Sequence, residues 1–145
     1  WQLAYMYYLS SLDLHLSDNA ATVKAAIDAL VSSGLTNLKE GIEQATGELD
    51  NGHAHERPAV PDFMVVITDG NPNVPGSTEA EARAFGKAAA DTAKAAGIEI
   101  FVVGVGSDVD AAYLKTIASG DDHYFAASNF TTLQSELAKL ASCTQ

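Results

Sequence analysis

The chain has a single cysteine, Cys143, among its 145 residues. One thiol cannot close an internal disulfide or build a cysteine-ligated zinc or iron–sulfur site, and it says nothing about the redox compartment. Long apolar runs are missing too, because none reaches the ~18 residues that a membrane-spanning helix needs. The first residues, Trp1–Ala4, lack a basic region ahead of an apolar core, so we expect neither a signal peptide nor a membrane anchor in this chain.

Basic residues are scarce as well. Eight lysines and arginines stand against 19 aspartates and glutamates, which gives a formal net charge of −11 at pH 7. This balance argues against nucleic acid or an anionic membrane as a partner and suits cations or a basic protein surface, although acidity alone also favours solubility. Hydrophobic residues make up 47% of the chain, which is enough for the core of one domain spanning residues 1–145.

Motifs for enzyme chemistry are equally sparse. The sequence has no Gly-x-Ser-x-Gly elbow and no readable Cys–His pair, so no nucleophile can be named. Gly104–Gly106 follows the pattern of a dinucleotide turn only in part, because the third glycine is absent and Asp108 would repel a pyrophosphate. His53–His55 has no third metal ligand placed by sequence and fits a solvated loop, while His15 and His123 fit ordinary surface or edge positions. We therefore predict no catalytic and no cofactor-binding residue, and no enzyme activity.

Two apolar runs dominate the second half of the chain. Phe63–Thr68 stops abruptly at Asp69 and Gly70, and Ile98–Gly106 follows it after a helical stretch. Such runs are typical of strands buried on both faces, and a crossover of this length makes the two strands parallel. Ligands bind at the carboxyl end of strands of this kind, where Asp69 would lie. The alternative is that Asp69 only caps the next turn.

The remaining elements can be placed from periodicity and capping residues. We expect two strands ahead of the first helix, at residues 3–9 and 12–16, joined by a hairpin through Ser10–Ser11. Helices are expected at residues 19–31, 37–49, 79–96, 110–118 and 130–140, with a last short strand at 123–126. Their caps would be Asp18 or Asn19, Thr36, and a Thr78–Glu81 capping box, with Gly34 closing the first helix. The expected order is β-β-α-α-β-α-β-α-β-α.

Five segments occur in an order and spacing that resemble one known family. They are Leu12–Asp18 before the first helix, Gly34–Asn37 at the start of the next, Met64–Gly70 and Phe101–Gly106 along the two apolar runs, and Tyr124–Leu137 near the end. Together they resemble the von Willebrand factor type A domain, also called the integrin inserted-domain fold. The resemblance implies an α/β fold with a doubly wound, mostly parallel, Rossmann-like sheet and helices on both faces.

The resemblance also implies a metal centre. That family builds a metal-ion-dependent adhesion site from an Asp-x-Ser-x-Ser loop, a threonine and an aspartate, and the last two match Thr36 and Asp69. The implied cofactor is Mg²⁺, or else Mn²⁺ or Ca²⁺, because hard cations prefer oxygen ligands and can leave one position for an acidic side chain of a partner. Thr36 could instead serve only as a helix N-cap.

The Asp-x-Ser-x-Ser loop occurs nowhere in these 145 residues. Aligned on its other segments, the chain begins at the family's second strand and lacks the first, which occupies the centre of a 3-2-1-4-5-6 sheet. We therefore expect an N-terminally incomplete domain, with a gap between the strands at 3–9 and 62–68 that residues upstream of Trp1 or another chain would fill. A competing alignment takes residues 3–9 as the first strand and Leu9–Asp13 as a degenerate metal loop, but it requires two strands and a helix to be deleted.

The function implied by the resemblance is a non-enzymatic protein-binding or adhesion module, with a protein or matrix ligand that offers an acidic residue. An extracellular or cell-surface location goes with that role. Two alternatives stay open, namely a structural or assembly subunit with a degenerate metal site and a nucleotide-binding α/β enzyme domain. The residues upstream of Trp1 would separate the three, because they would hold an Asp-x-Ser-x-Ser loop, neither motif, or a phosphate loop respectively.

Overall fold

The computed structural model describes residues 4–6, 10–31, 35–50, 59–128 and 132. Strands and helices alternate in the expected order: β1 Ala4–Met6, β2 Ser10–Leu12, α1 Ala20–Asp28, α2 Leu38–Glu48, β3 Phe63–Thr68, α3 Glu79–Ala95, β4 Glu99–Val105, α4 Ala111–Ile117, the short 3₁₀ helix η1 Asp121–His123, and β5 Tyr124–Ala127. Apart from Thr132, the helix expected at 130–140 lies outside the described residues. Within those residues, no helix combines the length and the apolar composition needed to cross a membrane.

The strands form two separate sheets. β1 and β2 pair antiparallel, with Ala4 opposite Leu12. β3, β4 and β5 pair parallel in that order, as expected when helices form the crossovers between them. In the described part of the chain, no strand pairing joins the first sheet to the second. The predicted α/β architecture is therefore confirmed, and so is the expected separation between the first strand and β3.

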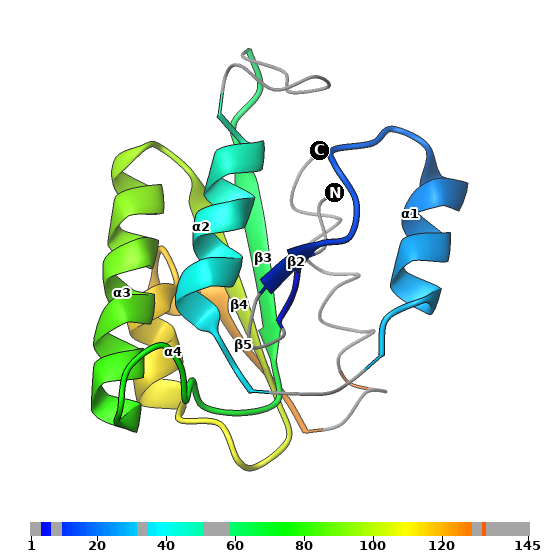
Figure 1. The fold of residues 1–145 in the computed structure, drawn as a ribbon. Coiled ribbons are helices and arrows are strands. Elements are labelled where there is room, and N and C mark those ends of the chain that lie inside the picture. Colours follow the sequence, from blue (N-terminus) through cyan, green and yellow to red (C-terminus); the bar gives the residue numbers. More distant parts are fainter. Residues whose placement is uncertain (1–3, 7–9, 32–34, 51–58, 129–131, 133–145) are drawn as a thin grey trace.

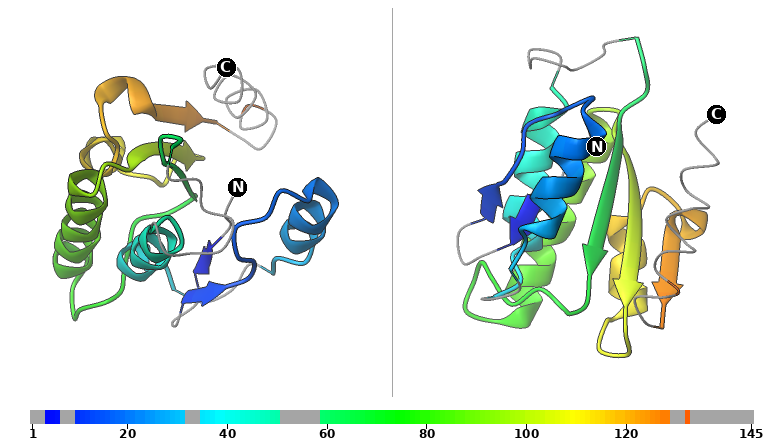
Figure 2. Two further views of the ribbon diagram at one scale, coloured as in Figure 1. Left: turned by 90° about the horizontal axis from the view of Figure 1, so that it is seen from above. Right: turned by 90° about the vertical axis from the view of Figure 1, so that its right-hand side faces the viewer.

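The helices lie in two groups. α2, α3 and α4 gather on one side of β3–β5, whereas α1 stands apart from them beyond β1 and β2 (Figures 1 and 2). The main core lies between the first group and the sheet, and consists of Leu38, Ile42, Ala45, Met64, Ala89, Ala90, Ala93, Ile98, Ile100, Val102, Tyr113, Leu114, Ile117 and Ala118. A smaller cluster of Val103, Val105 and Ala127 covers part of the opposite face.

The expectation that both faces of the first apolar run are buried is wrong for β3. Met64 and Thr68 are buried, but Phe63 and Ile67 remain 39% and 44% exposed. Because side chains alternate along a strand, Met64 points to the face covered by α2–α4, and Phe63 points to the other. Described residues cover that second face only around the small cluster, so the outer part of β3 is left open.

Two local expectations near the start of the chain also need correction. Ser10 and Ser11 belong to β2 rather than to a turn, since Ser10 pairs with Met6 and Ser11 with Tyr5. The second strand ends at Leu12, because residues 13–16 find no partner strand in the described part of the chain. Instead, Nδ1 of His15 contacts the buried carboxylate of Glu48 at 3.0 Å, which ties this segment to the end of α2.

The first helix is shorter than its apolar pattern predicts. Asn19 caps α1 as expected, with its side chain accepting hydrogen bonds from the backbone of Ala21 and Thr22. The helix ends at Asp28 and has no buried residue, and Ile27 is 48% exposed. Its expected apolar face is thus only partly covered, and the expected closing glycine, Gly34, lies outside the described residues.

Candidate functional site

The carboxyl ends of β3 and β4 and the segment before α2 meet at one edge of the molecule. The carbonyl of Thr36 accepts hydrogen bonds from the backbone N–H groups of Asn73, at 3.0 Å, and Val74, at 3.3 Å. The N–H of Thr36 donates to Oδ1 of Asn73 at 2.8 Å. The loop that begins at Asp69 is thereby held against the segment that carries Thr36, as the sequence pattern requires for a shared site.

The helix cap beside Thr36 is not made by Thr36 itself. Asn37 is the N-cap of α2, and its Oδ1 accepts a hydrogen bond from the N–H of Glu40 at 3.2 Å. The Asn37 amide also donates to the Glu40 carboxylate at 3.0 Å. The expectation that Thr36 caps this helix is therefore wrong by one residue. Its half-buried side chain makes no hydrogen bond within the described residues, so the hydroxyl is available for another role.

The turn after β3 is stabilised by Thr68, the residue before the predicted metal ligand Asp69. The hydroxyl of Thr68 donates to the carbonyl of Gly70 at 2.8 Å and accepts from its N–H at 3.3 Å. Asp69 is exposed, and its carboxylate makes no hydrogen bond or ion pair with any residue that the structure describes. The alternative that Asp69 serves to cap the turn is thus not supported.

The donor set at this edge suits a hard cation in part. Thr36 and Asp69 offer hydroxyl and carboxylate oxygens, which Mg²⁺ and Ca²⁺ prefer as ligands. Two oxygens are fewer than such an ion needs, so water or further loops would have to complete its coordination. Nowhere in the described ranges, this edge included, do three His, Cys, Asp or Glu side chains gather closely enough to hold a metal ion. The assignment of Thr36 and Asp69 as metal ligands stays a prediction.

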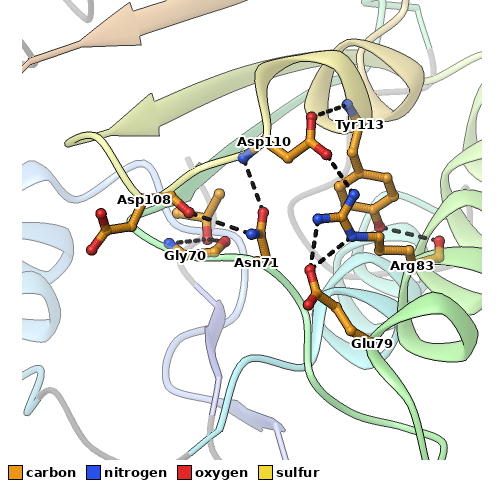
Figure 3. A network of polar contacts seen from close by, with 8 residues as sticks. Gly70, Asn71, Glu79, Arg83, Asp108, Asp110 and Tyr113 are labelled. Atoms are coloured by element: carbon orange, nitrogen blue, oxygen red, sulfur yellow. Dashed lines mark hydrogen bonds and ion pairs between the residues drawn. The ribbon is translucent and has the colours of Figure 1, made fainter.

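A second polar contact fixes the same loop on its other side (Figure 3). Oδ1 of Asn71 accepts a hydrogen bond from the N–H of Asp110 at 2.9 Å, and its amide donates to the carbonyl of Asp108 at 3.4 Å. The carboxylate of Asp110 caps α4 by accepting from the N–H of Tyr113 at 3.1 Å and binds Nη1 of Arg83 at 2.5 Å. The loop after β3 is therefore anchored to both α3 and α4.

Charge reinforces this anchor. The N–H of Tyr113, and after it the Arg83 guanidinium, hold the pKa of Asp110 below its ordinary value. The hydrogen bonds to Asp110 and then to Glu79 raise the pKa of Arg83. Arg83 spans the two acids, with Nη2 lying 2.6 Å from Oε1 of Glu79. Asp110 and Arg83 therefore stay charged at neutral pH, and their ion pair stabilises the structure rather than supplying a proton.

Residues 9–139 match the family model of the von Willebrand factor type A domain. The chain belongs to this family. Human matrilin-1 is 32% identical over 130 residues, which are 86% of this chain and 24% of matrilin-1. The chain therefore spans about a quarter of the length of that relative. This membership confirms the resemblance inferred from the five sequence segments.

Solved structures show the same fold at lower identity. Proximal thread matrix protein 1 from the mussel byssus, in a form with a zinc-occupied MIDAS motif, matches with a TM-score of 0.78 and 19% identity over 96% of this chain and 34% of its own. The von Willebrand factor domain of the type V pili tip protein Mfa5 from Porphyromonas gingivalis has a TM-score of 0.77 and 13% identity, covering 99% of this chain and 80% of its own. At such identities the similarity shows the fold alone.

From the sequence, the loop from Asn71 to Ser77 is expected to lie beside the candidate site and to form part of the ligand-binding edge. The sequence pattern did not identify Asn71 and Asn73 as the residues whose side chains join this loop to its two neighbours. The available signal was local: two asparagines flank Pro72 directly after a strand-ending aspartate. Asparagine side chains often bond to nearby backbone in turns, but nothing in the pattern indicates that these would reach 37 and 39 residues along the chain.

Proposed function

We propose that this chain forms most of a non-enzymatic protein-binding or adhesion module, in which Thr36 and Asp69 help to hold a divalent cation. The observation that carries the proposal is that, at this sheet edge, the residues that make the local hydrogen bonds are not the residues predicted to bind the metal. Asn37 and Thr68 supply the local hydrogen bonds that the helix start and the turn need. The hydroxyl of Thr36 and the carboxylate of Asp69 are thereby spared, and both have no partner within the described residues.

The overall charge favours a cation at this edge. With a formal net charge of −11, the protein repels an acidic ligand at long range. A bound Mg²⁺, Mn²⁺ or Ca²⁺ would reverse the sign of the field locally and offer a coordination position to a partner's carboxylate. The zinc-occupied MIDAS motif of the byssus protein supports a divalent cation in this fold. The proposed ligand is accordingly a protein or matrix component that presents an Asp or Glu side chain.

The proposed domain needs one more strand. β1 does not pair with β3, and the outer part of β3 exposes Phe63 and Ile67. A strand inserted between β1 and β3 would pair the open edge of each and cover apolar surface. We place its source outside these 145 residues, either upstream in the same polypeptide or in another chain. The loop following that strand would then supply the remaining metal ligands.

An extracellular or cell-surface setting accompanies this proposal. It is supported by the kinds of protein that share the fold, namely a byssus thread matrix protein and a pilus tip protein. Adhesion in such settings does not require catalysis.

The test is a Mn²⁺ titration of the complete protein that carries these residues, read by the loss of the free-ion signal in electron paramagnetic resonance. We expect saturable binding that competes with Mg²⁺, weakens at least tenfold in Asp69→Ala and falls in Thr36→Ala. Asp62→Ala is the matched control, because it removes one carboxylate at the opposite end of β3. Equal Mn²⁺ affinity in all four proteins would overturn the assignment, provided circular dichroism shows that each is folded.

A second candidate is a structural or assembly subunit whose metal site is degenerate. It is favoured by the finding that the described residues contain no cluster of three acidic or histidine ligands. The two candidates differ in their response to chelator. A metal-dependent module loses its partner in excess EDTA, whereas a structural subunit keeps its assembly unchanged.

A further inference from the structure

The loop from Asp69 to Asn73 is held by one asparagine on each side. Asn73 reaches the segment before α2 through the N–H of Thr36, and Asn71 reaches the loop after β4 through the N–H of Asp110. The amide of Asn71 adds a longer bond to Asp108. Three separate segments are therefore joined at the edge where the cation is proposed to bind.

Both contacts bear directly on the predicted ligands. Asn73 bonds to the backbone of Thr36 itself, and Asn71 lies two residues after Asp69. A metal site tolerates little error in ligand spacing, and the groups that orient its ligands strongly affect metal affinity. The anchor on the far side is firm, because Asp110 is fixed by the N-cap of α4 and by Arg83.

From this geometry we infer that Asn71 and Asn73 are positioning residues, which set the spacing between Thr36 and Asp69 and so determine the affinity for the cation. This role rests on the proposed function. It goes beyond that function because it makes the affinity for the cation depend on the side-chain amides of Asn71 and Asn73, which need not contact the ion.

The backbone bonds allow the role to be separated from simple folding. The N–H groups of Asn73 and Val74 donate to the carbonyl of Thr36 whatever side chain stands at position 73. Asn73→Ala should therefore leave the loop attached and the metal-free melting temperature nearly unchanged. It removes only the acceptor for the Thr36 N–H, whose hydrogen exchange should become faster.

The test uses the complete protein and Mn²⁺ as the probe. We expect Asn73→Ala and Asn71→Ala each to weaken Mn²⁺ binding by about tenfold or more, the effect typical of groups that orient metal ligands. Asn73→Asp keeps an acceptor for the Thr36 N–H, so this variant should bind Mn²⁺ more tightly than Asn73→Ala and nearly as tightly as the unsubstituted protein. The double variant Asn73→Ala/Ser77→Asp adds the same charge to the same loop without that acceptor and should not bind more tightly than Asn73→Ala.

The outcomes separate the two levels of the proposal. Absence of Mn²⁺ binding by the unsubstituted protein overturns the proposed function together with the positioning role. Normal binding by the unsubstituted protein and equally tight binding by Asn73→Ala and Asn71→Ala overturn the positioning role alone. Rescue by Ser77→Asp as complete as that by Asn73→Asp would also overturn it, because charge rather than the hydrogen bond would then set the affinity.

Discussion

The hydroxyl of Tyr113 occupies the space that a side chain on Gly86 would need. A Cβ atom placed on Gly86 would lie 2.5 Å from that oxygen and 3.4 Å from Cβ of Leu38. Burial raises the pKa of Tyr113 to about 12, so the hydroxyl keeps its proton and donates to the carbonyl of Arg83 at 3.2 Å. The missing side chain at Gly86 thus allows α2, α3 and α4 to pack together.

Gly86→Ala should destabilise the protein although alanine favours helices. The helical preference contributes about 1 kcal/mol in favour of the variant, but overpacking a filled core costs about 1–3 kcal/mol and the Tyr113 hydrogen bond about 1 kcal/mol. The helical gain and the hydrogen-bond loss cancel, so we expect a net loss of about 1–3 kcal/mol in the free energy of unfolding, measured by chemical denaturation. Gly47→Ala is the matched control, because a Cβ there meets nothing within 4 Å, and it should stabilise the protein.

The contact can be checked by a double-mutant cycle. Tyr113→Phe removes the hydroxyl and makes room for the new methyl group, so Gly86→Ala/Tyr113→Phe should lose less stability than the sum of the single variants. A coupling energy of about 0.5 kcal/mol or more is expected for groups in direct contact. Strict additivity would mean that the two positions do not compete for the same space.

His123 should make stability depend on pH near neutrality. Burial lowers its pKa, but hydrogen bonds to Glu99, at 2.5 Å from Nε2, and Asp122, at 2.7 Å from Nδ1, outweigh that effect and raise the pKa overall. A raised folded-state pKa contributes stability below the unfolded value of about 6.5 and loses it as the pH rises through the folded value. The free energy of unfolding should therefore decline above pH ~6.5.

NMR titration of the His123 ring measures this pKa directly. Asp122→Asn removes one carboxylate and should lower it, and replacing His123 by Gln should flatten the stability profile around neutrality. A His123 pKa at or below the ordinary value of about 6.5 would contradict the prediction.

Asp110 should have the opposite effect in acid. Its pKa is lowered by the N–H of Tyr113 and by Arg83, so it stabilises the fold above the unfolded carboxyl pKa of about 3.9. That contribution is lost as the pH falls through the lower folded value. Asp110→Asn retains a residue suited to capping but not the charge. The stability difference from the unsubstituted protein should be largest at neutral pH and should shrink between about pH 4 and pH 2.

A control for this titration is Asp121→Asn, which changes an exposed aspartate whose side chain makes no hydrogen bond or ion pair with the described residues. Its effect on stability should be small throughout. If the difference caused by Asp110→Asn stayed constant down to pH 2, the ion pair with Arg83 would not contribute to folding.

Hydrogen exchange can test the proposed extra strand. In the complete protein, the β3 amides that do not bond to β4 should be protected, because the inserted strand would bond to them. The same amides should exchange fast in the isolated 145-residue chain. Fast exchange of one edge of β3 in the complete protein would show that no strand pairs there.

The elements predicted best from sequence are those fixed by neighbouring residues. The capping box of Thr78 and Glu81 is confirmed, with both reciprocal hydrogen bonds present at the start of α3. The apolar runs at Phe63–Thr68 and Ile98–Gly106 contain the parallel strands β3 and β4. In each case the signal lies within a few residues, so the sequence contains all the information that the element requires.

The features that were missed depend on contacts between distant residues. Thr36 and Asn37 have similar capping chemistry, but in the folded chain the Thr36 N–H donates to Asn73 and Asn37 makes the cap. His123 was expected to be an ordinary surface or edge residue, yet its ring stacks on Phe101 with centroids 4.5 Å apart. Thr36 and Asp69 were identified through family resemblance, since no local rule links them.

The separation of the two sheets has a consequence for how the protein folds. β3, β4 and β5 follow one another along the chain with α3 and α4 between them, so each strand pairs with its immediate successor in sequence. The β1–β2 pair is more local still. Each of these pairings closes a shorter loop than the proposed extra strand would, because an upstream strand must reach β3 across β1, β2, α1 and α2. Assembly of the proposed metal-binding edge would then be the last step of folding, and the rate of that step would set how soon a newly made molecule could hold the proposed cation.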